Sequence, residues 1–583
     1  MSIFTRLLAK RDYWPLFGTM TLGAFNDNFM RQAMIAMLAY VTVGLTPADR
    51  SVMGSLATGL MVLPFFLFSS VAGELADRYR KSSIVKINKG FEFAVMLLAA
   101  VFFAFQSVAG LFVVIFLMGT QTAFFGPVKY GILPEIVEPD ELMAANGLFS
   151  GATYLAIVLG TTIGFYLVTT PLGPHLLMPI SLIVVGGLSF FFALRQPRSE
   201  LVNPDLKIDP LLFRSTAKIL QAARSDRGIW LSMLAMGWFW GMGSVLLSQM
   251  PVLSATVMGA KPEVGAAMVT MFAVGIAVGS LLVNKLAKGQ VTVTMVPASA
   301  ALMTVFLLAF AYAISAMPAA KPLSFGFGEF VRSPHHLAIA ALCLLISLSG
   351  GVFVVPLIAY IQRQAQPGQR ARIIAADNIV TSAFMVVASL LVTLMFKVGF
   401  SIAEVFVFIG ATAVLMTAMT VYFLPAAAFR CLLRIVLRVI FKPKVSGQAN
   451  LETVLEGPAL VICNHQSFAD VALLVAYIPR SLTFAIDVYR AQAWWVRFFT
   501  SFYKTIPLNP AQPIGARDLI SALDNGEMLV IFPEGRLNDN GEIMKIYDGA
   551  ALVASKAKCP LLPVILQDME YTSFGRLGKL RRH

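Results

Sequence analysis

Two similar stretches decide the fold. Pro127-Val128-Lys129-Tyr130 is followed by Ala144-Ala145-Asn146, and Pro356-Leu357-Ile358-Ala359-Tyr360 is followed by Ala375-Ala376-Asp377-Asn378. Each stretch comes after an apolar segment, and each second part leads into the next one. This recurrence indicates an internal repeat, which predicts a chain built from two similar halves.

Apolar segments fill the chain as far as residue 424. Of the 583 residues, 58% are hydrophobic and 13% are charged, and the mean hydropathy is +0.77. That composition excludes an ordinary soluble protein, and a membrane-spanning helix needs about 20 apolar residues. We predict twelve spans, at 13–40, 52–76, 84–105, 109–131, 147–169, 174–194, 229–258, 264–287, 290–316, 336–362, 373–397 and 401–424.

A polar linker at 195–228 separates the two predicted halves, 1–194 and 229–424. Two six-helix halves with a site between them are the architecture of rocking transporters. The predicted fold class is therefore a membrane all-α bundle of twelve transmembrane helices in two halves, followed by a cytoplasmic α/β domain at 451–583. The Lys and Arg residues gather in alternate loops, so both ends of the membrane domain are expected to face the cytoplasm.

The net charge and the cysteine spacing indicate which partners and metal sites to expect. The net charge is +14, but no basic run is interleaved with aromatic residues, so nucleic acid is not an expected partner and anionic lipid is. The four cysteines lack metal-ligand spacing, so neither a disulfide framework nor a metal site is predicted.

Charged residues lie inside the first predicted span. Asp27 and Arg31 are four residues apart and share a helix face, next to Asn26 and Asn28. A charge at bilayer depth costs a few kcal/mol, which makes these residues a functional hypothesis. The alternative is a buried pair that neutralises itself. If the halves enclose a cavity, this cluster would meet further polar residues there: Lys129, Tyr130, Asn146, Gln249, Tyr360, Asp377 and Asn378.

Such a mixture would suit a zwitterionic head group. Its phosphate would lie near Arg31 or Lys129, and its ammonium near Asp27.

Basic residues recur between the two predicted domains, at 425–450. Every fourth position there is cationic, namely Arg430, Arg434, Arg438 and Lys442, and the intervening residues are largely apolar. The pattern predicts an amphipathic helix on the anionic surface of the membrane. The alternative is a connector packed on protein.

Beyond residue 451, short apolar runs alternate with helical intervals, which indicates an α/β layer. The run 458–463 delivers His465 at its carboxyl end, where open α/β sheets bind ligands. Asp470 follows, and a carboxylate that fixes the imidazole tautomer makes the opposite nitrogen a base. Ser467 could instead be a nucleophile, although direct transfer to an acceptor hydroxyl needs only the base.

Several motifs carry family resemblances. Gly73, Asp77 and Arg78 resemble the gating-loop signature of the major facilitator superfamily, although that family usually has Gly two residues after the Arg, where Arg80 stands. The stretch 126–135, with Asn146 after it, resembles the lysophospholipid transporter branch of that superfamily.

The last part resembles the glycerolipid acyltransferase family. Asn464-His465 with Asp470 matches its Asn-His-x-x-x-x-Asp motif, 532–536 matches Phe-Pro-Glu-Gly-Thr-Arg without the Thr, and 562–564 is similar to its Val-Pro-Val strand. The resemblance implies that His465 deprotonates a glycerol hydroxyl, which attacks an acyl thioester, while Asp470 orients the base. It places the acceptor against Glu534, Gly535, Arg536 and Asn509. It implies no tightly bound cofactor, and acyl-acyl-carrier protein or acyl-coenzyme A as the donor.

One cation of the family's pattern is missing. The middle motif, which often carries a phosphate-binding Arg, reads Ile506-Pro507-Leu508-Asn509 here. A phosphodiester needs less positive charge than a monoester, so lysophosphatidylethanolamine is expected as acceptor rather than lysophosphatidate.

The expected function joins the two domains. A monomer in the bacterial inner membrane would move lysophospholipid to the cytoplasmic leaflet and reacylate it, with acyl-carrier protein a possible partner. The family normally continues beyond this point, so truncation after residue 583 is expected. Two alternatives stay open: a lysophosphatidate acyltransferase anchored by a non-transporting domain, and an amphiphile or drug exporter with a degenerate lipid domain.

Overall fold

The computed structural model describes Lys10 and residues 13–136, 142–198, 212–287, 293–317, 325–365, 370–447, 450–451, 453–455, 457–467, 469–488, 502–508, 514–537 and 544–571. The chain divides into two compact units. One comprises Met1–Val291 and Ser299–Thr417, and the other comprises Thr292–Ala298 and Ala418–His583.

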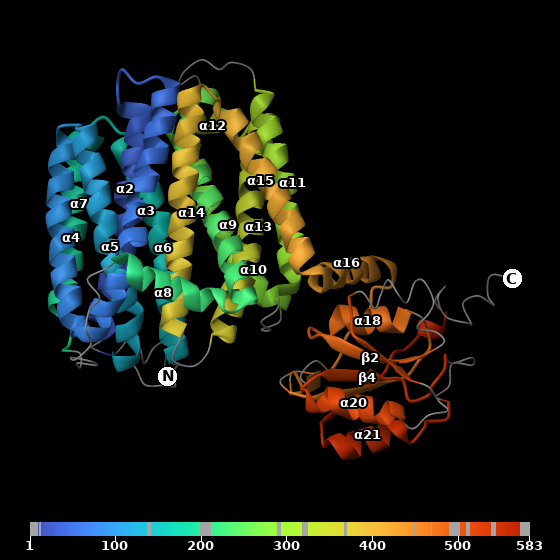
Figure 1. The fold of residues 1–583 in the computed structure, drawn as a ribbon. Coiled ribbons are helices and arrows are strands. Elements are labelled where there is room, and N and C mark those ends of the chain that lie inside the picture. The colour runs from blue at the N-terminus through green and yellow to red at the C-terminus, as the bar shows by residue number, and fades with distance from the viewer. Residues whose placement is uncertain are drawn as a thin grey trace. The chain divides into compact units, whose positions relative to one another are not determined.

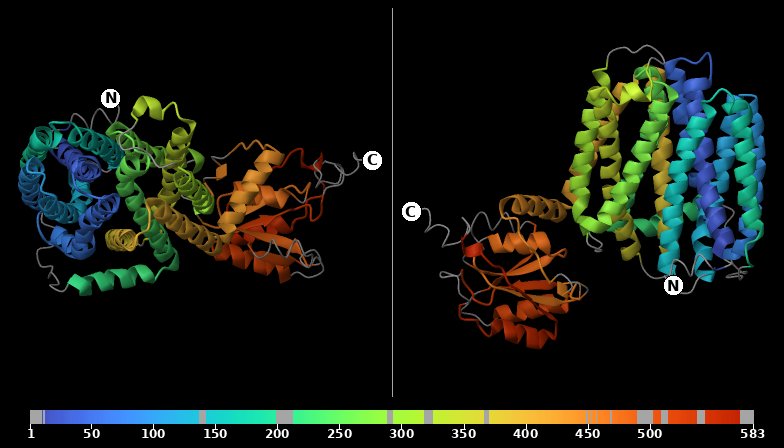
Figure 2. Two further views of the ribbon diagram at one scale, coloured as in Figure 1. Left: turned by 90° about the horizontal axis from the view of Figure 1, so that it is seen from above. Right: turned by 180° about the vertical axis from the view of Figure 1, so that it is seen from behind.

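The described residues as far as Phe423 are mainly helical, and their long helices run side by side (Figures 1 and 2). They are α2 (Tyr13–Ala36), α3 (Pro47–Arg78), α4 (Lys81–Ala104), α5 (Val108–Ile136), α6 (Leu142–Val168), α7 (Met178–Leu194), α9 (Arg227–Val252), α10 (Pro262–Ala287), α11 (Val296–Ser315), α13 (Pro334–Gln364), α14 (Arg370–Val398) and α15 (Ile402–Phe423). Shorter elements are η1 (Met37–Val41), η2 (Gly173–Leu177), η3 (Leu253–Val257), η4 (Val293–Met295) and α12 (Phe327–Phe330).

Ten helices of the described part are long and apolar enough to cross a membrane, so the chain is a multi-pass membrane protein. The predicted segments 13–40 and 147–169 also fold as helices, α2 and α6, but neither is among the ten. The polar cluster around Asp27 makes α2 less apolar, and only Leu155–Val168 qualifies as an apolar stretch within α6. Twelve spans in two halves therefore stays a prediction.

Small residues allow the membrane helices to approach closely. A Cβ on Gly160 or Gly164 of α6 would clash with the backbone of α2 at Phe25 and Phe29. The two glycines are four residues apart, the small-xxx-small spacing that lets helix backbones meet in a membrane. This contact fixes α2, and with it Asp27, against α6.

A helix lies where the sequence predicted only a polar linker. Residues Leu212–Arg224 form α8, which packs against α3 and α14 across the lower end of the bundle in Figure 1. Ala223 is fully buried, and the Thr216 hydroxyl donates to Ser70 Oγ of α3 at 3.3 Å. The many basic residues of 195–228 suggested a linker, although part of this segment has the spacing of an amphipathic helix.

The second unit contains a five-stranded sheet of order β3-β2-β4-β1-β5, in which all paired strands are parallel. Its strands are β1 (Ala459–Cys463), β2 (Leu482–Asp487), β3 (Thr505–Leu508), β4 (Met528–Ile531) and β5 (Leu561–Val564). Its helices are α16 (Pro425–Ile440), α18 (Ala469–Tyr477), α20 (Ile514–Asp524) and α21 (Gly549–Ala557), with a last turn η6 (Met569–Tyr571). The predicted α/β layer is confirmed, and β3 is a strand that the sequence reasoning did not assign.

Apolar side chains cover both faces of this sheet, as expected for buried parallel strands. Val461 of β1 packs with α18 on one face, and Leu460 packs with α20 and α21 on the other. Figure 1 shows α18 on one side of the strands and α20 and α21 on the opposite side. The result is a three-layer domain whose strands end at a common edge.

The cationic side of α16 faces the α/β domain. The Arg430 guanidinium donates to Arg480 O at 2.7 Å, and the Arg434 guanidinium lies 5.4 Å from the centre of the Tyr477 ring. The opposite side of the helix is apolar and exposed, with Leu432, Ile435, Val436, Val439 and Ile440.

Candidate functional site

The carboxyl end of β1 brings together the two residues that the sequence paired. His465 Nδ1 lies 3.0 Å from Asp470 Oδ2, and the side chains are 18% and 0% exposed. Asp470 lies in the first turn of α18 and reaches back to the loop that carries His465. With Asp470 accepting at Nδ1, the neutral ring carries its lone pair on Nε2, which can act as a base.

The Asp470 carboxylate is held from several sides. Its Oδ2 accepts hydrogen bonds from the backbone N–H groups of Gln466 at 2.7 Å and Ser467 at 2.8 Å. Hydrogen bonds from backbone N–H groups fix the position and orientation of a carboxylate. The loop backbone thus fixes the Asp470 carboxylate directly beside the imidazole.

Ser467 caps the helix that follows. Its hydroxyl accepts a hydrogen bond from Ala469 N at 3.2 Å, and the residue is fully buried. The bond leaves the Ser467 side chain at the start of α18, a common place for serine. This geometry favours a capping role over the alternative in which Ser467 is a nucleophile.

Glu534 joins the second motif to the first. It follows β4 and is 2% exposed; its Oε1 accepts from His465 N at 3.1 Å, and its Oε2 accepts from Met544 N at 3.3 Å. These bonds fix the backbone at His465. The acceptor-binding role predicted for Glu534 stays a prediction.

Two neighbours of His465 were not predicted as site residues. The Phe532 ring stacks on the imidazole, with centroids 4.2 Å apart. Asn464 Nδ2 donates to Leu566 O and Asn464 Oδ1 accepts from Leu566 N, both at 2.8 Å. Both residues belong to the quoted motifs, but their partners are distant in sequence, so spacing alone could not reveal these contacts.

Two of the remaining predicted acceptor residues lie at the surface. Gly535 and Arg536 are exposed after β4. Gly535 has a φ of 67°, a conformation that favours glycine, and its N–H donates to Phe532 O at 3.1 Å. Asn509 lies outside the described residues.

Cys463 ends β1 immediately before the motif. Burial raises the pKa of its thiol above the usual value, and the charges of Asp470 and Glu534 raise it further. A thiol so placed stays protonated at neutral pH and is a poor nucleophile.

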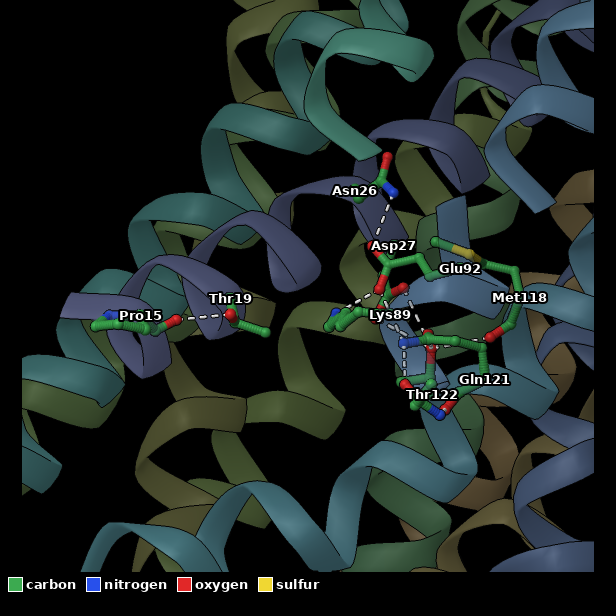
Figure 3. Close-up of polar contacts among 10 residues, drawn as sticks. Pro15, Thr19, Asn26, Asp27, Lys89, Glu92, Met118, Gln121 and Thr122 are labelled. Atoms are coloured by element: carbon green, nitrogen blue, oxygen red, sulfur yellow. Dashed lines mark hydrogen bonds and ion pairs between the residues drawn. The ribbon is translucent and has the colours of Figure 1, made fainter. Parts of the chain in front are cut away.

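The polar cluster of α2 contacts two neighbouring helices. Thr122 Oγ1 of α5 lies 3.2 Å from each carboxylate oxygen of Asp27, and Arg31 Nη2 donates to Asn28 Oδ1 at 2.9 Å. Asn26 Nδ2 donates to Glu92 Oε1 of α4 at 3.0 Å (Figure 3). Asp27 thus contacts α5, and Asn26 contacts α4.

Glu92 and Lys89, neither of which was predicted as a site residue, form a buried ion pair on α4. Both charges fall within the predicted span 84–105, three residues apart. The rule that drew attention to Asp27, that charges at membrane depth are functional hypotheses, applies equally to this pair.

Of the other predicted transport residues, the structure describes the side chains of only some. The side chains of Lys129, Tyr130 and Asn146 lie outside the described part of the structure, as does that of Asp77. Asp377 and Asn378 lie on α14, where Asp377 Oδ1 is buried and has no hydrogen-bond partner among the described residues.

The predicted gating residues lie at the carboxyl end of a helix. Gly73, Asp77 and Arg78 belong to the last turns of α3, and only Tyr79 and Arg80 separate it from α4. The Arg78 guanidinium lies 5.5 Å from the centre of the Tyr79 ring.

The two sites define a membrane transporter fold joined to an acyltransferase domain. Residues 17–331, more than half of the chain, match the Major Facilitator Superfamily model, and residues 442–567 match the Acyltransferase family model. The chain therefore belongs to the major facilitator superfamily and carries a carboxyl-terminal acyltransferase domain. The resemblances to the major facilitator superfamily and to an acyltransferase family are therefore confirmed.

Curated relatives match the membrane part. The chain is 29% identical to the lysophospholipid transporter LplT of Klebsiella pneumoniae subsp. pneumoniae, covering 68% of this chain and 91% of that protein. It is 26% identical to LplT of Escherichia coli O157:H7 (strain EC4115 / EHEC), covering 69% of this chain and 93% of the relative.

Solved structures share the fold. An auto-inhibited peptide transporter of the POT family has a TM-score of 0.54 at 16% identity, covering 70% of this chain and 96% of that one. A D-xylose-proton symporter has a TM-score of 0.52 at 11% identity, covering 70% and 97%. At these identities the likeness concerns the fold alone.

Proposed function

We propose that this protein is a lysophospholipid transporter and acyltransferase in one chain. The observation that carries the proposal is the contact of His465 Nδ1 with the buried Asp470 carboxylate, at the edge of a sheet that follows a membrane domain of the major facilitator type. The membrane helices supply lysophospholipid to the cytoplasmic leaflet, and the attached domain restores its missing acyl chain.

The acyl transfer needs one base and no covalent enzyme intermediate. His465 Nε2 takes the proton of the glycerol hydroxyl as that oxygen attacks the thioester carbonyl carbon. The ester C–O bond forms, the C–S bond breaks, and the imidazolium returns its proton to the leaving thiolate. Asp470 stabilises the imidazolium between these steps. The products are a diacyl phospholipid and a free thiol.

The acceptor is lysophosphatidylethanolamine. Arg536, exposed after β4, offers a guanidinium for its phosphodiester. We assign Gly535 and Asn509 to acceptor binding from their places in the sequence motifs. The family's middle-motif Arg is absent at 506–509, which lowers the positive charge available to a monoester. The donor is a thioester, on acyl-carrier protein or coenzyme A.

Transport is supported by the relatives, whose name states lysophospholipid transport and whose length this chain nearly covers. In this proposal α2 and α6 also span the membrane, which gives twelve spans in two halves of six. The lysolipid head group binds between the halves. Its ammonium contacts Asp27, and its phosphate contacts Arg31 or Lys129.

The helix α16 lies on the membrane surface. It begins at Pro425, and only Leu424 separates it from the span that ends at Phe423. Its start is therefore at the bilayer boundary. Its exposed side is a stripe of large apolar residues at helical spacing, with Val439 72% exposed, and this stripe inserts among the lipid acyl chains. Arg430 and Arg434 hold the acyltransferase domain, while Arg438 and Lys442 remain for anionic lipid.

The test uses the full chain in liposomes of a bacterial inner-membrane composition. Labelled lysophosphatidylethanolamine and lysophosphatidate compete for movement across the bilayer and for conversion to diacyl product, with either acyl donor. We expect movement and product from lysophosphatidylethanolamine. Product from lysophosphatidate alone, without movement, would establish an anchored acyltransferase instead. Movement of unrelated amphiphiles without product would establish an exporter.

A further inference from the structure

A charged pair outside the predicted site lies inside the helix bundle. The Lys89 ammonium and the Glu92 carboxylate of α4 form an ion pair, and each side chain is 1% exposed. Desolvation of two opposite charges can outweigh their attraction, so an apolar pair of the same volume would often be at least as stable. Packing alone therefore gives no reason for this pair.

Glu92 is the common acceptor of three helices. Its Oε1 accepts from Asn26 Nδ2 of α2 at 3.0 Å, and its Oε2 accepts from Gln121 Nε2 of α5 at 2.9 Å as well as from Lys89 on its own helix. Figure 3 shows these side chains converging on Glu92. The Glu92 carboxylate of α4 thus forms hydrogen bonds to both α2 and α5.

Lys89 supplies the opposite charge, and its ammonium lies close to the backbone of α2 at Gly23. A Cβ on Gly23 would clash with Lys89 Nζ, so the glycine leaves room for the ammonium. The ammonium also lies 4.3 Å from the centre of the Phe125 ring. The face of an aromatic ring attracts a cation, so this contact helps to hold the Lys89 side chain in place.

A chain of polar contacts connects Glu92 with Asp27. Gln121 Nε2 donates to Glu92, and Gln121 Oε1 lies 3.0 Å from Thr122 Oγ1. The same Thr122 oxygen lies 3.2 Å from both oxygens of Asp27. A hydroxyl has one hydrogen, so Met118 O at 2.9 Å, the Gln121 oxygen and the Asp27 carboxylate compete for it, and a charged acceptor makes the stronger bond.

We propose that Lys89 and Glu92 are positioning residues for Asp27, and that they set the head-group selectivity of transport. This inference rests on the proposed function, in which Asp27 binds the lysolipid ammonium. Glu92 fixes Asn26 next to Asp27 and fixes Gln121 next to Thr122. The Asp27 carboxylate is therefore held toward the ammonium rather than free to turn to Arg31 on the following turn.

The experiment compares two lysolipids in liposomes that contain the full chain. Lysophosphatidylethanolamine carries an ammonium and lysophosphatidylglycerol does not, so the ratio of their transport rates reports on the contact with Asp27. Thr122→Val removes the hydroxyl and keeps the shape. Lys89→Met with Glu92→Gln removes both charges together and leaves no unpaired ion.

We expect each of these variants to lower the ratio about tenfold, the effect of losing a hydrogen bond to a charged group. Thr19→Val is the matched control on α2, because the Thr19 hydroxyl is buried and donates to Pro15 O of the same helix at 2.6 Å. It should leave the ratio unchanged. Glu92→Gln alone should lower the ratio too, and the double variant covers the case in which the single one fails to fold.

Asp27→Asn separates the two proposals. If that variant lowers the ratio while Thr122→Val and the double variant slow both lipids equally, the positioning role is wrong and the pair is structural. If Asp27→Asn leaves the ratio unchanged, or the wild type moves neither lipid, the transport site of the proposed function is wrong.

Discussion

Glu534 accepts a hydrogen bond from the backbone N–H of His465 at 3.1 Å, so the second acyltransferase motif holds the first in place. The bond joins the ends of two neighbouring parallel strands, β1 and β4. Through it, the loop that carries the base is anchored twice, by Glu534 from one side and by Asp470 from the other.

Asp470→Asn should lower the rate of acyl transfer on the order of a thousandfold, the usual range for loss of an oriented general base. The amide removes the charge that stabilises the imidazolium. It also changes which ring nitrogen of the neutral His465 carries the proton. The measurement is single-turnover product formation in detergent micelles. An asparagine variant as fast as the wild type would show that Asp470 does not orient the base.

Substitution of Glu534 should act on kcat. Glu534→Ala leaves the backbone N–H of His465 without its acceptor, at a cost of about 1–3 kcal/mol, so kcat should fall roughly tenfold or more. Glu534→Gln keeps one oxygen and should fall less. If both variants instead raise KM for the acceptor at constant kcat, the carboxylate binds the head group, as the sequence predicted.

The Cys463 thiol should resist alkylation in the folded protein. Its raised pKa means that at pH 7–8 it holds less thiolate than an ordinary cysteine, and reactivity should appear only as the pH rises above the ordinary value of about 8.5. The same shift predicts that stability is retained below that value and falls at more alkaline pH. A variant with Cys463 as its only cysteine is treated with maleimide with and without denaturant. Rapid labelling of the folded form at pH 7 would contradict the burial.

The exposed side of α16 should matter for lipid in a bilayer. Ile435→Glu with Val439→Glu places charges on the apolar stripe and should lower acyl transfer to bilayer lysolipid at least several-fold. Transfer to a short-chain, water-soluble lysolipid should be unchanged. Lys442→Gln removes one of the cations assigned to anionic lipid but leaves the stripe intact, so it should have a smaller effect. Equal loss with both substrates would indicate that the stripe packs on protein.

Local sequence predicted much of this molecule. The apolar segments predicted the long helices, because a helix in lipid satisfies its backbone hydrogen bonds within its own segment. The spacing of His465 and Asp470 predicted their contact. The strand β3 was missed because it is short and contains Pro507. The partners of Asn464 and Phe532 come from other strands, and only the folded sheet brings them together.

The Lys89–Glu92 pair shows a different limit. Both charges were visible inside a predicted span, but which helices they join depends on the packing of α2, α4 and α5. Sequence could have named these residues, though not their connection to Asp27.

Transport and acylation by a His465→Ala variant of the full chain in liposomes would show directly whether the two sites work separately. Two separate sites in one chain predict that labelled lysophosphatidylethanolamine still crosses the bilayer at the wild-type rate, while diacyl product falls on the order of a thousandfold. Loss of movement together with product in a folded variant would contradict the account, since it would mean that the membrane helices do not transport lysolipid on their own.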